Sequence, residues 1–338
     1  MCIEQKMYVV VTDYMPNDGS RDVSDDIQRL IDENPNRTIY FPDGTYILSK
    51  PILTPAHPER SVSLSLSCYA KLKASDDWSD SEAMVRLGAK DAANDIYTVG
   101  SNYYLEGGII DGNYRANGVS VDGGRETVVR NLSMKHTKVG LYIKYGANCG
   151  SSDCDIYNVN IVGTRTEDSV GVIVEGHDNT FTAMRIADVL VGFDIRSGGN
   201  FLRTIHPLFT LDFSHFDKSC AFYDKKGTNW FDNCYADNFC MSFREGDMDK
   251  GSVYNGCFCF WYSPKGDKHI AFKADGTFHS QLSLFKVDFN FGESKNVILE
   301  VGRDGGIGRF ERLITTIPLL GDNTHEKYLN GALIEKNA

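Results

Sequence analysis

A glutamate, a histidine and an aspartate stand within four residues in the stretch Glu175-Gly-His-Asp178, directly after the alternating segment Gly171-Val-Ile-Val. Carboxylates and imidazoles are the side chains that most often move protons in enzymes. We therefore take Glu175 as the first candidate for a proton-transferring group, with His177 and Asp178 as candidate substrate contacts. The alternative is that His177 is a surface histidine at a corner of the chain.

Glu175 belongs to a repeat in which a glycine, an alternating stretch and a charged residue follow one another. The clear copies end at Asp122, Lys144, Glu175 and Arg196, and weaker copies end at Lys225, Arg244 and Lys273. The copies are unevenly spaced, as in coils of about 20 residues that carry loops of different length. In stacked coils, equivalent residues lie about 4.8 Å apart. The charged residues are therefore expected to form one column.

This column has two interpretations. It is either a solvent-exposed ladder of ion pairs, which stabilises little, or a catalytic ridge in which clustered charges shift one another's pKa values. Glycoside hydrolysis uses two carboxyl groups, about 5–5.5 Å or about 6.5–9.5 Å apart, and the candidates are Glu175, Asp194 and Asp122. Elimination needs a base and cations that neutralise a uronate, for which Lys144 and Arg196 are candidates. Flanking cations would favour the ionised form of Glu175, which leaves Asp194 as the better acid.

Further candidates lie in loops and at corners. The long loop Ile205–Asp217 carries two histidines and two aspartates that could bind a metal, although their spacing is not diagnostic: His206, Asp212, His215 and Asp217. Trp230 and Trp261 stand near corners, where an exposed ring suits the face of a sugar and a buried ring suits the core.

A helix and two strands at the start of the chain have the strongest local signals. Ser24 is the expected N-cap of a helix over residues 24–34, and a face that includes Ile27 and Leu30 is apolar. Asn34-Pro35 ends the helix, and two strands follow around the turn Pro42-Asp43-Gly44. The rest of the chain shows only short alternating segments with asparagines beside them, which predicts a parallel β-helix capped by this helix. A β-propeller and a β-sandwich are the alternatives.

The segment Gly19-x-x-Asp-x-x-x-x-Ile27, followed by Tyr40-Phe-Pro-x-Gly-x-Tyr46, resembles the N-terminal signature of the pectate-lyase-like superfamily. The stretch Glu106–Gly112 is similar to a structural Gly-x-Ile-Asp-Gly turn of polygalacturonases. The resemblance implies an all-β fold, a single-stranded right-handed parallel β-helix solenoid with an N-terminal capping helix. It also implies one domain over residues 1–338, with a cap region at 1–50, coils at 51–300 and a C-terminal cap or tail at 301–338. The polygalacturonase catalytic motifs are not present, because Glu175-Gly-His-Asp178 lacks their second glycine and the Asn-Thr-Asp and Asp-Asp motifs are absent.

Composition restricts the partners. The net charge of −11 disfavours nucleic acid as a partner, because binding nucleic acid needs a basic surface. The sequence has no run of about 18 apolar residues, so no membrane-spanning helix is predicted. The nine cysteines include no Cys-x-x-Cys pair, so neither a zinc site nor another metal site is expected. No phosphate-loop or dinucleotide motif indicates a cofactor. An odd number of thiols and the lack of a signal sequence favour the cytoplasm, or secretion if a leader has been removed.

The resemblance therefore predicts a carbohydrate-active enzyme that cleaves a glycosidic bond, as a glycoside hydrolase or a polysaccharide lyase, with a carbohydrate as its partner. The alternatives are a non-catalytic, tailspike-like β-helix that binds glycans, with a homotrimer as the candidate assembly, and a glycan transferase or epimerase on the same scaffold.

Overall fold

The structure is a computed structural model that describes residues 8–57, 60–90, 104–145, 151–210, 214–262, 266, 268–289, 295–316, 328 and 333–336. The chain divides into two compact units, which are described separately. The first unit comprises residues 1–162 and 175–177, and the second comprises residues 163–174 and 178–338. The prediction of one domain over the whole chain stays a prediction.

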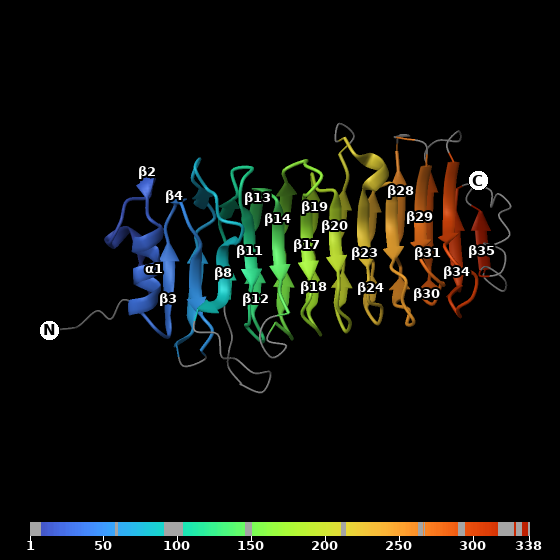
Figure 1. Cartoon of the computed structure of the whole chain (residues 1–338), viewed down its shortest axis with the longest axis horizontal. Helices are drawn as coiled ribbons and strands as arrows, with labels where there is room; N and C mark the ends of the chain where they lie inside the picture. Colours follow the sequence, from blue (N-terminus) through green and yellow to red (C-terminus); the bar gives the residue numbers. More distant parts are fainter. Residues whose placement is uncertain are drawn as a thin grey trace. The chain divides into compact units, whose positions relative to one another are not determined.

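The first unit is built from parallel strands that stack in three sheets, each coil supplying one strand to each sheet (Figure 1). The first sheet holds β1 (Val9–Val10), β3 (Arg37–Phe41), β6 (Val62–Leu66), β9 (Tyr104–Glu106), β12 (Val128–Arg130) and β15 (Asp155–Tyr157). The second holds β2 (Asp18–Asp22), β4 (Gly44–Leu48), β7 (Ala70–Ala74), β10 (Ile109–Asp111) and β13 (Ser133–Thr137). The third holds β5 (Ile52–Pro55), β8 (Ala83–Lys90), β11 (Asn117–Val121) and β14 (Val139–Ile143). Strand β16 (Asn160–Gly163) ends at the boundary between the units.

The second unit repeats this plan. Its first sheet holds β18 (Thr180–Thr182), β21 (Phe201–Arg203), β24 (Trp230–Asp232), β27 (Val253–Asn255), β30 (Gln281–Ser283) and β33 (Arg309–Phe310). Its second holds β19 (Arg185–Ala187), β22 (His206–Leu208), β25 (Tyr235–Asp237), β28 (Phe258–Trp261), β31 (Phe285–Phe289), β34 (Arg312–Thr315) and β35 (Leu333–Lys336). Its third holds β17 (Val170–Val174), β20 (Val191–Ile195), β23 (Cys220–Asp224), β26 (Met241–Glu245), β29 (Lys268–Ala274) and β32 (Lys295–Val301). The expected fold class, an all-β parallel solenoid with a helix near its N-terminus, is confirmed.

The helix α1 (Ser24–Glu33) closes the start of the first unit, as the sequence predicts. Ile27 and Leu30 are buried, and Gln28 exchanges two hydrogen bonds with the backbone of Leu53 in β5, at 2.8 and 3.0 Å. The capping differs from the expectation, because Ser24 is the first helical residue and Asp22 Oδ1 accepts its N–H at 3.0 Å. The helix therefore covers apolar surface that the first coils would otherwise expose to water.

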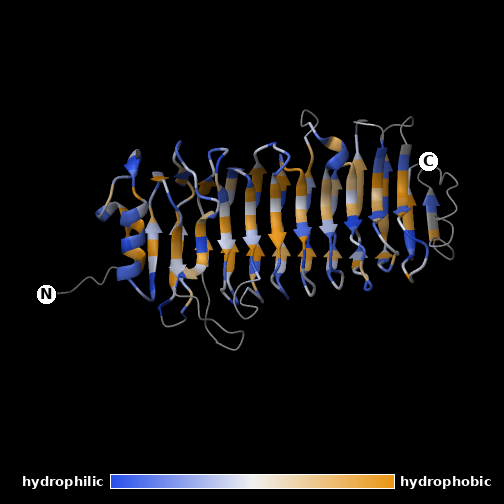
Figure 2. Ribbon diagram, in the orientation of Figure 1, coloured by the Kyte–Doolittle hydropathy of each residue, from blue (hydrophilic) through white to orange (hydrophobic). Residues whose placement is uncertain are grey.

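The strands of the second unit carry both hydrophobic and hydrophilic residues (Figure 2). The buried apolar side chains stack in register and make its core. Phe193, Phe222, Phe243 and Phe272 occupy equivalent positions of successive strands, and the rings of Phe222 and Phe243 are 4.9 Å apart. At one corner, Asn200 Nδ2 donates to the side-chain oxygen of Asn229 at 3.1 Å, in a buried polar ladder. Such a ladder satisfies backbone groups where the chain leaves a sheet.

The cysteines pack as small core residues. Cys2 and Cys149 lie outside the described residues, and the other seven are free thiols, of which all but Cys68 are buried. Among the described residues no helix has the length and apolar character to cross a membrane.

The register corrects part of the predicted column. The backbone N–H groups of Arg196, Lys225, Gly246 and Asp275 bond to equivalent carbonyls of the preceding coils. Gly246 and Asp275 therefore follow Arg196 and Lys225, whereas Arg244 pairs with Tyr223 and Lys273 pairs with Arg244. The later copies of the repeat were misaligned because their alternating patterns fit either alignment.

Candidate functional site

In the first unit the predicted stacking of charges is present, but the charges neutralise one another. The N–H groups of Asp122, Lys144 and Glu175 bond to the ends of successive strands, so these residues leave the coils at the same level. Arg86 Nη2 contacts Asp122 at 2.5 Å, and Lys144 Nζ contacts Glu82 at 2.5 Å and Asp122 at 3.5 Å. We call Glu82, Arg86, Asp122 and Lys144 the charge network. The hydrogen bond from Lys144 lowers the pKa of Glu82 below its ordinary value.

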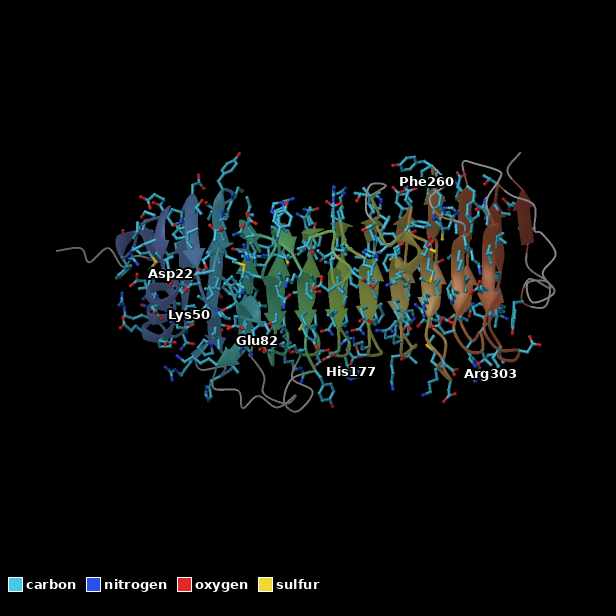
Figure 3. All side chains as sticks on the ribbon, turned by 45° about the horizontal axis from the view of Figure 1, so that its top comes forward. Asp22, Lys50, Glu82, His177, Phe260 and Arg303 are labelled. Carbon is cyan, nitrogen blue, oxygen red and sulfur yellow. The ribbon has the colours of Figure 1, made fainter. Side chains whose placement is uncertain are left out.

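His177 belongs to the first unit together with Glu175, and its ring meets that of Tyr145 edge to face, with centroids 6.0 Å apart. Figure 3 shows His177 on the outside of the coil. Asp178 is exposed in the second unit. Because Glu175 and Asp194 lie in different units, the expected spacing between these carboxyl groups stays a prediction.

Asp194 has two cationic partners in the second unit. Arg196 Nη2 lies 2.7 Å from one carboxylate oxygen, and Lys225 Nζ lies 2.6 Å from the other. Proton donors in enzymes more often stand in apolar surroundings or beside another carboxylate. Asp194 is thus ion-paired on both oxygens, and its role as the acid stays a prediction.

Three predicted substrate contacts lie on other parts of the second unit. Trp261 in β28 is fully buried and its indole N–H donates to the carbonyl of Phe239, so it presents no face to a ligand and the expected contact is corrected to core packing. Trp230 in β24 is 39% exposed and stacks on Phe201 at 4.8 Å. His206 in β22 stacks on Tyr235 at 4.2 Å. Their roles as sugar contacts stay predictions.

An open groove of about 520 Å³ lies over the third sheet of the second unit. We call it the cationic groove. It is lined by residues of β26, β29 and β32, of the short helix η4 (Phe216–Lys218), and by Cys240 just before β26. The lining residues are Asp217, Lys218, Cys240, Met241, Arg244, Lys268, Ile270, Lys273 and Glu300. Four of these side chains are cationic and two are anionic, in a chain whose net charge is −11.

The helix η4 is held at the rim of the groove by its one buried side chain. Phe216 contacts Phe209 at 5.8 Å and His269 at 5.2 Å, measured between ring centroids. The next two residues, Asp217 and Lys218, therefore face the groove. The sequence predicted that the loop ending at Asp217 borders a site, although Asp212 in that loop lies outside the described residues.

The floor of the groove holds more cations than carboxylates. Arg244 Nη2 lies 2.9 Å from Asp275. Lys273 Nζ lies 3.1 Å from Glu300, which is also bonded to Lys268. On the floor, three cations thus face two carboxylates, whereas at η4 Lys218 is paired with Glu167 and Asp217 adds a further carboxylate. The Arg244 guanidinium lies over the ring of Tyr223, with its central carbon 4.3 Å from the ring centroid.

The surroundings of Glu300 favour its ionised form. Burial alone would raise the pKa of Glu300, but hydrogen bonds from Lys268 and Lys273 outweigh it and hold this pKa below its ordinary value. Burial raises the pKa of the Cys240 thiol to about 12, so it is protonated and a poor nucleophile. Burial likewise raises the pKa of Tyr223 to about 12. Glu300 is therefore the lining group suited to act as a base or nucleophile.

Two carboxyl groups lie behind the groove, inside the coils. Asp224 and Glu245 end strands β23 and β26 at paired positions, and both are fully buried. Asp224 accepts a hydrogen bond from Ser252 at 2.6 Å, and Glu245 accepts one from Ser280. Burial raises the pKa of each, and the negative charge of Asp224 raises that of Glu245 further.

The sequence indicated Arg244 and Lys273 as outward charges but missed Lys268, Lys218 and Glu300. The only available signal was the excess of lysine in the short segments around these strands. Within the described part of the chain, no group of three or more histidine, cysteine, aspartate or glutamate side chains could hold a metal ion.

A family model described as rhamnogalacturonase A/epimerase, pectate lyase-like, matches residues 8–65. The matched range contains the signature from Gly19 to Tyr46, so the resemblance is confirmed for this part of the chain. A comparison with curated proteins gave no match.

Solved structures share the fold at low sequence identity. The ORF18 protein of Geobacillus virus E2 is 17% identical, with a TM-score of 0.56 over 91% of this chain and 61% of its own. The tailspike protein of E. coli bacteriophage HK620, in complex with a pentasaccharide, is 10% identical, with a TM-score of 0.69 over 98% of this chain and 63% of its own. The catalytic domain of a GH87 alpha-1,3-glucanase in complex with tetrasaccharides is 12% identical, with a TM-score of 0.65 over all of this chain and 69% of its own. The chain thus spans less than two thirds of the viral proteins.

Proposed function

We propose that the chain is a carbohydrate-recognising β-solenoid protein and that the cationic groove binds an acidic glycan. The observation that carries this proposal is the set of three cations, Arg244, Lys268 and Lys273, that share two carboxylates on the floor of an open groove. Two similar solved structures hold oligosaccharides, which supports a glycan over another polyanion.

The acidic chain as a whole repels polyanions, so the attraction must be local. A groove lined by one sign of charge concentrates the field above it. Carboxylates of uronic acids accept strong hydrogen bonds from guanidinium and ammonium groups. An extended polymer is the ligand shape that suits a surface of stacked parallel strands.

Cleavage of the bound glycan is the second candidate function, and the state of Glu300 favours it. Two lysines keep Glu300 ionised, as hydrolysis requires of a base or nucleophile. Asp217 is the other carboxyl that lines the groove and would be the proton donor. The column at Glu175, with Asp122 in the same unit, remains the alternative proposed location for catalysis.

A panel of polysaccharides tests both functions. Alginate, polygalacturonate and hyaluronate supply uronates, and dextran is the uncharged comparison. We expect binding to at least one acidic polymer and none to dextran. New reducing ends without ultraviolet absorbance would indicate hydrolysis, and absorbance of an unsaturated product would indicate elimination. Equal binding of dextran and of all acidic polymers would contradict the proposed ligand class.

A further inference from the structure

The anion position between Lys268 and Lys273 is already filled by a carboxylate of the protein. Glu300 lies on β32 opposite Lys273 on β29, and the two side chains meet at 3.1 Å. Lys268, from the start of the same strand β29, reaches the other oxygen of Glu300. A ligand carboxylate that enters this position must therefore displace Glu300.

Resting on the proposed function, we propose that Glu300 is a built-in competitor that sets the charge selectivity of the groove. It makes the groove accept a chain that carries several carboxylates and reject a single one. The inference concerns selectivity and holds whether or not the glycan is cleaved.

The physical reason is that one carboxylate replaces another at the same cations. A single ligand carboxylate replaces the Glu300 carboxylate at the same two lysines, so it gains little free energy from the swap. Glu300 is tethered, and a tethered group competes at an effective concentration on the order of millimolar. A monovalent acid at lower concentration is therefore excluded.

A ligand with several carboxylates can overcome the competition from Glu300. While one of its groups exchanges with Glu300, another exchanges with Asp275 at Arg244 or with Glu167 at Lys218, the further cations that line the same groove. Linked groups bind as one event, and each further contact adds to the affinity without a second loss of translational freedom. Glu300 thus separates polymers from monomers more strongly than the cations alone would.

The variant Glu300→Gln tests this inference, with Glu311→Gln as the matched control. Glu311 is a carboxylate of the same unit, bonded to Ser283, Gln281 and Arg309 in the first sheet, and does not line the groove. Both variants remove one negative charge from the unit. Thermal unfolding followed by circular dichroism checks that each variant folds, and Glu300→Ala serves as a second variant.

Calorimetric titration with galacturonic acid and with a galacturonate oligosaccharide gives the readout. We expect Glu300→Gln to bind the monomer at least about fivefold more tightly than wild type, with a smaller gain for the oligosaccharide, because the competing charge is gone. Glu311→Gln should match wild type. If wild type binds the oligosaccharide but Glu300→Gln binds the monomer no better, the competitor role is overturned and the proposed function stands. If neither protein binds either sugar, nor alginate and hyaluronate oligosaccharides, the proposed function itself fails.

Discussion

The charge network of the first unit and the cationic groove of the second are made from the same kinds of side chain but differ in balance. In the charge network two cations, Arg86 and Lys144, meet two carboxylates, Glu82 and Asp122, at 2.5–3.6 Å. On the groove floor three cations meet two carboxylates, beneath an open volume of about 520 Å³. The groove floor therefore differs from the charge network in its excess of cations and in the open space above it.

The largest expected effect comes from removing cations of the groove. The double variant Lys268→Ala, Lys273→Ala should bind an acidic oligosaccharide at least about a hundredfold more weakly, because it removes both cations and leaves the Glu300 carboxylate unpaired, where it repels a ligand of the same charge. Calorimetry measures this. Lys286→Ala is the control for the loss of one lysine away from the groove, because Lys286 lies over the ring of Phe258 at 4.7 Å in the second sheet, and it is compared with each single lysine variant as well as with the double variant. An equal loss in the control would show that general charge, not the groove, attracts the ligand.

The capping helix tests the stability of the first unit. Leu30→Ala should lower the free energy of unfolding by about 2–5 kcal/mol, because Leu30 is buried and its truncation leaves a cavity. Urea denaturation gives the value. A cost below about 0.5 kcal/mol would mean that the helix is not packed as described.

The buried pair behind the groove makes stability depend on pH. Because the pKa values of Asp224 and Glu245 are raised in the folded protein, folding takes up protons at a pH above the ordinary carboxyl range. Their contribution is fully present below the unfolded pKa and is lost as pH rises through the folded pKa. Stability should therefore fall as pH rises above the ordinary carboxyl range.

Glu82 and Glu300, whose pKa values are lowered, contribute above the unfolded pKa and do not oppose this trend. Urea midpoints across the range measure it, and Glu245→Gln should flatten the profile. A wild-type midpoint that rises with pH would contradict the assignment.

The smallest effect is expected in the first unit. Glu175→Gln should change glycan affinity and any cleavage rate by less than about threefold if the groove alone binds and acts, as the excess of cations there indicates. Rates on the acidic polymer bound most tightly give the comparison. A larger loss in cleavage with unchanged affinity would move catalysis to the column at Glu175.

The features that could be predicted from the sequence are those that depend on neighbouring residues. The helix at Ser24–Glu33 follows from its apolar face and from Asn34-Pro35, and the corner asparagines follow from their tolerance of left-handed backbone. The groove could not be predicted, because Lys218, Lys268 and Glu300 meet only through the register of coils that carry loops of different length. Trp261 was misassigned because an aromatic residue at a strand end has the same pattern in a core as at a surface.

The excess of cations in the groove is tested most directly by comparing one acidic and one neutral oligosaccharide of equal length. Calorimetric titration of the wild-type protein with a galacturonate oligosaccharide and with a dextran oligosaccharide makes this comparison. The charge balance predicts binding of the acidic sugar only, weakened by added salt and lost in the Lys268→Ala, Lys273→Ala variant. Equal affinity for both sugars, unchanged in that variant, would contradict it.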